Sequence, residues 1–295
     1  MIISVSRRTD IPAFYAEWFL NRLREGFVLV RHPFRPSQIE RISLAPVDVD
    51  ALVFWTRNAD PLIPHLDELD SRGYRYYFQY TLVHYPKSLE KSPISLSQKI
   101  ERFRKLSERI GPERIIWRYD PVILTILTDQ QYHRRCFEEI AKGLRGFTHR
   151  CMISFLDVYR KTKQKMAELS GKEAMRLIDL HQDEEKAREL SRLFSERARE
   201  YALELFTCAE PFDLEDLGIR HGKCVDDRLI GRLFGLNLSL TKDRGQRRLC
   251  RCVESKDIGT YDTCPHGCVY CYANTSDELA QRNFQRHDAY APMLC

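Results

Sequence analysis

The stretch "IISVSRRTDIPAFYAEWFLNRLREG", residues 2–26, joins a short apolar run to a longer amphipathic segment. Residues 2–6 have the β-branched, apolar composition that favours a strand. Further along, Phe14, Trp18 and Leu23 recur at helical spacing, and Gly26 follows as a helix stop. A strand followed by a helix is the unit from which parallel sheets are built.

The same unit recurs along the chain. Further strands are predicted at residues 50–56, 76–82, 114–119, 151–156 and 203–208, and helical apolar stripes lie at residues 96–110, 137–144 and 187–201. This alternation predicts an α/β fold, namely a parallel (β/α) barrel, complete or partial. Residues 27–46 interrupt it with two apolar runs and several prolines, which predicts an inserted hairpin. We expect one domain over residues 1–295, because no repeat or low-complexity linker divides the chain.

Composition sets the class of protein. The chain has 295 residues, 43% of them apolar, which is enough for one large core. It has no apolar run of the length that a membrane span needs, and its N-terminus does not resemble a signal peptide. These features predict a cytoplasmic protein that is not bound to a membrane. The net charge of +5 is mild, and the basic patches at Arg7-Arg8 and 244–248 are weak evidence for nucleic-acid binding.

Polar residues follow the predicted strands. In parallel βα folds the carboxyl ends of the strands share one edge, where ligands bind. For any single strand end, a wet loop is the better explanation of such residues, but their recurrence at six strand ends favours a polar ligand, with arginines available for anionic groups. The substrate-binding candidates are Arg57, Asn58, Gln79, Arg118, Asp120, Asp157, Tyr159 and Glu210.

Three cysteines lie close together in "TCPHGCVYCYAN", residues 263–274. Cys264, Cys268 and Cys271 have the spacing C-x3-C-x2-C, in a chain with ten cysteines. A reducing cytosol disfavours disulfides, so clustered cysteines there more often bind metal. Three thiolates on one loop suit a 4Fe–4S cluster with one iron left without a protein ligand. Zinc would require a fourth ligand, either His266 or a remote cysteine.

This stretch resembles the cluster-binding signature of radical S-adenosylmethionine (SAM) enzymes, including the aromatic Tyr270 directly before the last cysteine. The resemblance implies a 4Fe–4S cluster and SAM as cofactors, with Tyr270 near them. It also implies a 5′-deoxyadenosyl radical acting on an unidentified substrate, and an electron donor of the flavodoxin or ferredoxin kind. Over nearly its whole length the chain also resembles an uncharacterised bacterial family of unknown function, described as carrying a radical-SAM-like cysteine cluster at its C-terminus. The matching stretches are "SVSRRTDIPAF", "FWTRN", "WRYDP" and "SKDIGTYDTCPHGCVYCYAN".

The motif lies at the opposite end of the chain from its usual place in radical SAM enzymes, which is after the first barrel strand. A circularly permuted barrel reconciles the two, with residues 250–261 supplying that strand and residues 2–6 pairing beside it. Arg8 would then pair with the SAM carboxylate, and Asp10 would accept a hydrogen bond from the SAM ammonium group. Alternatively, Asp10 caps the helix that follows it.

The C-terminal part, residues 209–295, is predicted to be irregular and rich in cysteine. Cys208, Cys224, Cys250 and Cys252 provide the four thiols that a second 4Fe–4S cluster or a structural zinc ion needs. The alternative is a set of buried thiols without metal. The leading functional prediction is a radical SAM enzyme, and the alternative is a non-catalytic iron–sulfur or zinc protein that binds nucleic acid.

Overall fold

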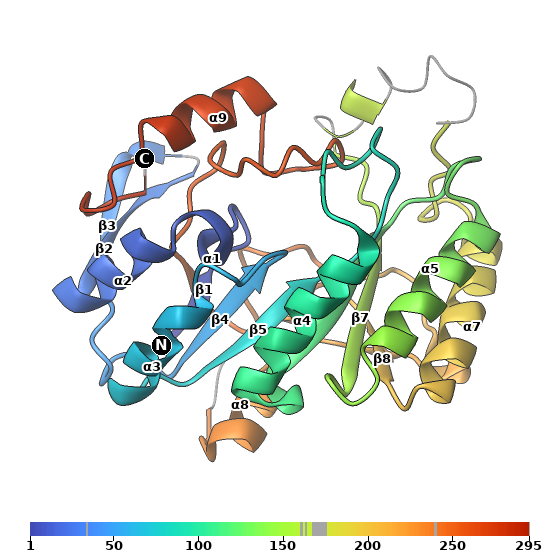
Figure 1. Cartoon of the computed structure of the whole chain (residues 1–295), viewed down its shortest axis with the longest axis horizontal. Helices are drawn as coiled ribbons and strands as arrows, with labels where there is room; N and C mark the ends of the chain where they lie inside the picture. Colours follow the sequence, from blue (N-terminus) through green and yellow to red (C-terminus); the bar gives the residue numbers. More distant parts are fainter. Residues whose placement is uncertain (34, 160–161, 163, 167–175, 239–240, 295) are drawn as a thin grey trace.

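An eight-stranded sheet forms the centre of the molecule in the order β10-β1-β4-β5-β6-β7-β8-β9, and its neighbouring strands pair in parallel. The computed structural model describes residues 1–33, 35–159, 162, 164–166, 176–238 and 241–294 (Figure 1). All six strands predicted from the sequence are present. They are β1 (Ile2–Val5), β4 (Ala51–Thr56), β5 (Tyr76–Thr81), β6 (Ile115–Val122), β7 (Arg150–Phe155) and β8 (Glu204–Thr207).

The two edge strands, β9 (Arg220–His221) and β10 (Lys256–Asp257), are short. Strand β10 pairs in parallel with β1, with Ile3 opposite Lys256. This confirms the expected pairing of residues 250–261 with residues 2–6. Within the described residues β9 and β10 do not pair with each other, so the sheet is open there. The parallel α/β sheet is therefore confirmed, whereas a closed barrel is not observed.

Helices cover one face of the sheet. Figure 1 shows α4, α5 and α7 packed side by side on this face. Their buried residues Phe103, Phe137 and Phe194 join strand residues such as Phe78 and Trp117 in the main hydrophobic core. The helices before the C-terminal part include α1 (Ile11–Phe14), α2 (Ala16–Glu25), α3 (Leu66–Ser71), α4 (Leu96–Ile110), α5 (Gln130–Gly143) and α7 (Glu184–Glu200). Short 3₁₀ turns include η1 (Ile63–His65), η2 (Pro112–Arg114) and η4 (Glu215–Leu217).

The opposite face of the sheet carries a second, smaller apolar cluster. Val53, Tyr77 and Ile116 point to this face because side chains alternate along a strand, and they pack against Leu229 and Ile230. The last two residues belong to α8 (Asp227–Phe234), and α9 (Asp277–Gln285) follows near the end of the chain. The prediction of an irregular C-terminal part was therefore too strong. Both helices are short, and they begin at the side-chain caps Asp226 and Ser276.

The inserted hairpin is confirmed as the antiparallel pair β2 (Phe27–His32) and β3 (Arg35–Ser43). Its strand β2 contacts the C-terminal segment, where the backbone N–H of Leu29 donates to Pro292 O over 2.8 Å. No helix in the described part of the chain is long and apolar enough to cross a membrane.

Candidate functional site

The loop of residues 263–274, here called the cysteine loop, lies beyond the carboxyl end of β10. Its thiols Cys264, Cys268 and Cys271 are partly exposed and close enough to affect one another electrostatically. Burial raises the pKa of all three thiols, and the charge of Cys271 raises it further at Cys264 and Cys268. A cation beside the thiols favours their ionised forms, as Arg57 does at Cys268 and as a bound metal would.

The cysteine loop and the segment that contains Thr9 have further features that suit a bound group. Gly267 has φ 68°, a conformation that favours glycine. The backbone N–H of Ala273 donates to Cys271 Sγ over 3.3 Å. Oδ1 of Asn274 and Oγ1 of Thr9 are buried without a hydrogen-bond partner among the described residues. Both the thiols and the spare polar atoms are thus compatible with an additional group.

No three His, Cys, Asp or Glu side chains in the described ranges are arranged to hold a single metal ion. A cluster makes a different demand, because its cysteines bind separate iron atoms and need not converge on one point. The three thiols of the cysteine loop therefore fit a cluster better than a single ion.

Asp257, the last residue of β10, connects the segment before the cysteine loop to β1 and to the residues that follow β1. Its carboxylate accepts hydrogen bonds from Ser4 Oγ (2.9 Å), Ser6 Oγ (2.6 Å) and the backbone N–H of Arg7 (2.8 Å). It also accepts from the N–H of Gly259 over 3.0 Å. A Cβ at Gly259 would lie 2.0 Å from Ser6 Oγ, so the two segments can approach this closely only with glycine there.

Arg8, predicted to hold the SAM carboxylate, contacts the same junction. Its Nη1 donates to Gly259 O over 3.2 Å, and its Nε lies 3.9 Å from Asp257 Oδ1. The guanidinium also lies over the ring of Tyr261, 5.3 Å from the centroid. Arg8 is thus positioned beside the cysteine loop, while its contact with SAM remains a prediction.

Asp10 uses both carboxylate oxygens within the protein. Oδ1 accepts from the backbone N–H of Ala13, which caps α1, and from Thr56 Oγ1 over 2.7 Å. Oδ2 accepts from the N–H of Arg57 and lies 2.8 Å from His266 Nε2. The capping role is therefore confirmed. The SAM-binding role remains a prediction, and it would place SAM where His266 now contacts the carboxylate.

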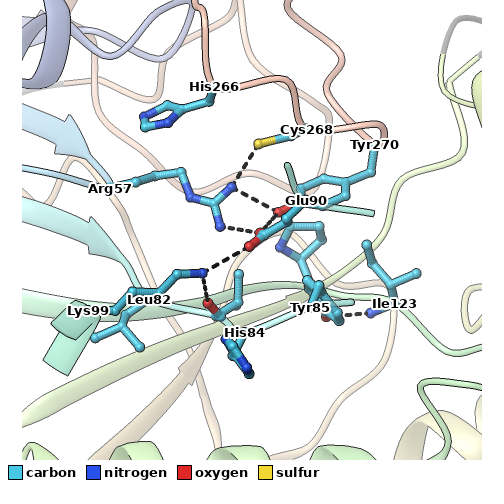
Figure 2. Close-up of polar contacts among 12 residues, drawn as sticks. Arg57, Leu82, His84, Tyr85, Glu90, Lys99, Ile123, His266, Cys268 and Tyr270 are labelled. Atoms are coloured by element: carbon cyan, nitrogen blue, oxygen red, sulfur yellow. Dashed lines mark hydrogen bonds and ion pairs between the residues drawn. The ribbon is translucent and has the colours of Figure 1, made fainter. Parts of the chain in front are cut away.

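A buried ionic network lies against Cys268 (Figure 2). Arg57 Nη1 is 2.8 Å from Cys268 Sγ and 3.0 Å from the hydroxyl oxygen of Tyr270, and Arg57 Nη2 forms an ion pair with Glu90. Glu90 also accepts from the Tyr270 hydroxyl and lies 3.1 Å from Lys99 Nζ. The network joins the ends of β4 and β5 to the cysteine loop, and its carboxylate side chain is only 3% exposed.

The charges in this network support one another. Burial would raise the pKa of Glu90, but Arg57 and Lys99 outweigh it and keep the pKa below its usual value. Burial would likewise lower the pKa of Arg57, but Cys268 and Glu90 raise it well above normal. Burial raises the pKa of Cys268 to about 11, although Arg57 opposes that rise. A fixed guanidinium is therefore ready to stabilise negative charge on Cys268.

A cavity of about 350 Å³ opens beside this network. It lies at the carboxyl ends of β4 and β5, where parallel sheets place their ligands. Its volume falls within the range of small-molecule sites. The polar residues in its wall include Arg57, Asn58, Glu90, Lys99, His266 and Cys268.

Four further cysteines, Cys208, Cys224, Cys250 and Cys252, gather on the opposite face of the sheet, at what is here called the four-cysteine site. Cys208 Sγ lies 3.2 Å from Cys224 Sγ. The backbone N–H of Cys224 points at Cys252 Sγ over 3.3 Å, and that of Cys252 points at Cys250 Sγ over 3.5 Å. All four thiols are buried. The structure thus brings together four cysteines from three separate segments of the chain.

Three of the predicted substrate-binding residues lie at the four-cysteine site rather than at the cysteine loop. Gln79 Nε2 donates to Cys224 O over 2.8 Å, and Arg118 Nη1 lies 2.7 Å from Cys224 Sγ. Arg118 also forms an ion pair with Asp120, which accepts from the Ser154 hydroxyl. The predicted strand-end residues therefore do not all lie at one site.

The remaining candidates occupy the edge near β7 and β8. Asp157 forms an ion pair with Arg247, while Tyr159 is 43% exposed. Glu210 is buried and lies 2.9 Å from His181 Nε2. Burial raises the pKa of Glu210, although its hydrogen bond with His181 opposes that rise. These residues do not contact the ionic network at Cys268 through any interaction found in the described residues.

Sequence reasoning missed Asp257, Glu90 and Lys99. Asp257 lies within "SKDIGTYDTC", so its position directly before the loop could have drawn attention. Glu90 lies in a segment without a recognisable motif, and Lys99 belongs to the polar side of an amphipathic helix. Neither position carries a sequence signal that distinguishes it from solvated surface.

Comparisons with known proteins leave the activity open. No curated protein and no solved structure matches this chain. One family model, described as "Domain of unknown function (DUF1848)", matches residues 2–273. The match includes β1, the four-cysteine site and most of the cysteine loop. The chain therefore belongs to the DUF1848 family.

Proposed function

We propose that the protein is a radical SAM enzyme whose 4Fe–4S cluster is bound by Cys264, Cys268 and Cys271. One observation carries the proposal: the cysteine loop follows β10, which pairs in parallel with β1. The loop is late in the sequence, yet it follows an edge strand at the carboxyl side of the sheet. This is the arrangement expected of a partial, circularly permuted radical SAM barrel.

The residues around the loop fit the cofactors. The three thiols are close enough to influence one another, and Cys271 Sγ receives a backbone hydrogen bond. When bound, the cluster and SAM supply a 5′-deoxyadenosyl radical that abstracts a hydrogen atom from the substrate. The protein supplies the binding groups, their orientation and the exclusion of water.

The cavity beside Cys268 is our candidate for the SAM site. Its volume is about 350 Å³, and Cys268 forms part of its wall. Arg57 remains charged and lines the cavity beside Cys268 Sγ, which its Nη1 contacts. Arg8 and Asp10, anchored at the neighbouring junction, are the groups we expect to bind the methionyl carboxylate and ammonium of SAM.

The direct test is cleavage of SAM by anaerobically reconstituted and chemically reduced protein. We expect the parent to release 5′-deoxyadenosine, measured by chromatography, and the variant with Cys264, Cys268 and Cys271 all changed to Ala to release none. Cys136→Ala removes a buried thiol on α5 and serves as the matched control. Undiminished 5′-deoxyadenosine production by the triple variant would refute the proposal. A non-catalytic iron–sulfur or zinc protein would release none in either form.

A further inference from the structure

The four-cysteine site is assembled from separate segments of the chain. Cys208 follows β8, Cys224 precedes α8, and Cys250 and Cys252 precede β10. Their exposed fractions are 8%, 1%, 6% and 3%, respectively. Free cysteines are usually buried singly as small apolar residues, so four thiols in one place are unusual.

Backbone groups at this site point toward sulfur. The N–H groups of Cys224 and Val225 lie 3.3 and 3.4 Å from Cys252 Sγ. Two donors directed at one sulfur suit a thiolate better than a neutral thiol, because hydrogen bonds to a charged acceptor are stronger. Such bonds also orient and stabilise thiolates that are bound to metals.

Two arginine side chains lie beside the four-cysteine site. Arg118 Nη1 lies 2.7 Å from Cys224 Sγ. The guanidinium groups of Arg118 and Arg7 lie 4.9 and 5.2 Å from the ring centroid of Trp55. Nη2 of Arg7 is buried without a hydrogen-bond partner among the described residues, and its Nη1 lies 3.9 Å from Asp243.

Buried arginines require anionic partners. Asp120 and Asp243 provide part of that charge, but neutral thiols would provide none at the sulfur positions that Arg118 contacts. Four thiolates around a divalent ion, or around a 4Fe–4S core, carry a net charge of about −2. This charge would match the two arginines.

We propose that Cys208, Cys224, Cys250 and Cys252 bind a second metal centre through their thiolates, with Arg118 and Arg7 as the counter-cations. The candidate occupants share a thiophilic metal and four sulfur ligands: a 4Fe–4S cluster, whose irons bind separate thiolates, fits the described side chains better, whereas a zinc ion would require the four thiols to converge on one point. The site lies on the face of the sheet opposite α4, α5 and α7. It does not depend on the proposed radical SAM activity.

The test measures the metal that remains when the cysteine loop cannot bind any. The full chain with Cys264, Cys268 and Cys271 changed to Ala is purified anaerobically from cells supplied with iron and zinc. Elemental analysis and acid-labile sulfide should then show either about one zinc per chain or about four irons with four sulfides. Adding Cys250→Ser and Cys252→Ser should abolish this content, whereas Cys136→Ser or Cys151→Ser should preserve it. Absence of both metals from the folded triple variant would overturn the proposal.

A second variant tests the proposal even if the loss of two cysteine ligands prevents folding. Arg118→Gln leaves all four thiols in place but removes the cation beside Cys224. We expect it to bind the same metal about 10- to 100-fold less tightly in competition with a chelator, as is common when a group supporting a metal ligand is lost. Metal retention equal to that of the parent would refute the role of Arg118 as counter-cation.

Discussion

Replacing Glu90 by Gln tests whether the ionic network at Cys268 is a structural requirement. Glu90 is 3% exposed and forms ion pairs with both Arg57 and Lys99, whose side chains are 19% and 11% exposed. Glutamine keeps the size of the side chain and one carbonyl oxygen, but it removes the negative charge. Two largely buried cations would then have lost their shared carboxylate partner.

The expected cost follows from this burial. Removing one partner of a buried ion pair typically destabilises a protein by about 3 to 5 kcal/mol, because the other charge stays buried without compensation. Cys268 and the remaining amide oxygen can each satisfy part of the demand of Arg57. We therefore expect Glu90→Gln to lower the free energy of unfolding by about 3 kcal/mol, at the lower end of that range.

Glu68 offers a matched control. It also bridges two arginines, Arg24 at 2.6 Å and Arg72 at 3.0 Å, but these side chains are 49% and 37% exposed. Exposed ion pairs contribute only about 0 to 1 kcal/mol, so Glu68→Gln should change stability little. Urea denaturation followed by circular dichroism measures both variants against the parent. If the two substitutions shifted the transition equally, the reasoning from burial would be wrong.

Two other predictions concern single residues. Asp10→Asn keeps an acceptor for the cap of α1 but removes charge, so SAM binding, measured by equilibrium dialysis, should weaken by roughly 30- to 150-fold. Unchanged binding would assign Asp10 to capping alone. Burial lowers the pKa of His133 to about 4, although its hydrogen bond with Ile123 O opposes that fall. The unfolded chain protonates first as pH falls, near its ordinary pKa of about 6.5, so stability should fall by about 2 to 3 kcal/mol between about pH 7 and about pH 4.5. Denaturation of His133→Gln across this range should lack that component, and an identical pH dependence in the variant would contradict the assignment.

The strands and the main helices were predictable because their signals are local. Apolar runs such as residues 51–56 are long enough to identify a buried strand without knowledge of its neighbours. The pairing of β10 with β1 was predicted only through the radical SAM resemblance, since two residues carry no periodic pattern. The short helices α8 and α9 were missed for the same reason.

The candidate site was only partly predictable because side chains near the ends of the strands can point to either face of the sheet. Arg118 and Gln79 lie within their strands, and the pleat directs both toward the four-cysteine site. Arg57 follows the end of β4, where the chain turns toward the cysteine loop. A list of strand-end residues does not distinguish these directions. Glu90 was unpredictable because its partners depend on how two loops pack.

The pairing of β1 with β10 also fixes an order of events during synthesis. Ser4 and its partner Asp257 are separated by 253 positions in the sequence. At about 5–20 residues per second, a ribosome needs roughly 10 to 50 s to add that much chain. During this interval the outer edge of β1 has no partner, and an unpaired strand edge can associate with other chains. The shortness of β1, Ile2–Val5, limits that hazard. The cysteine loop thus emerges long after β1, the strand beside which β10 pairs.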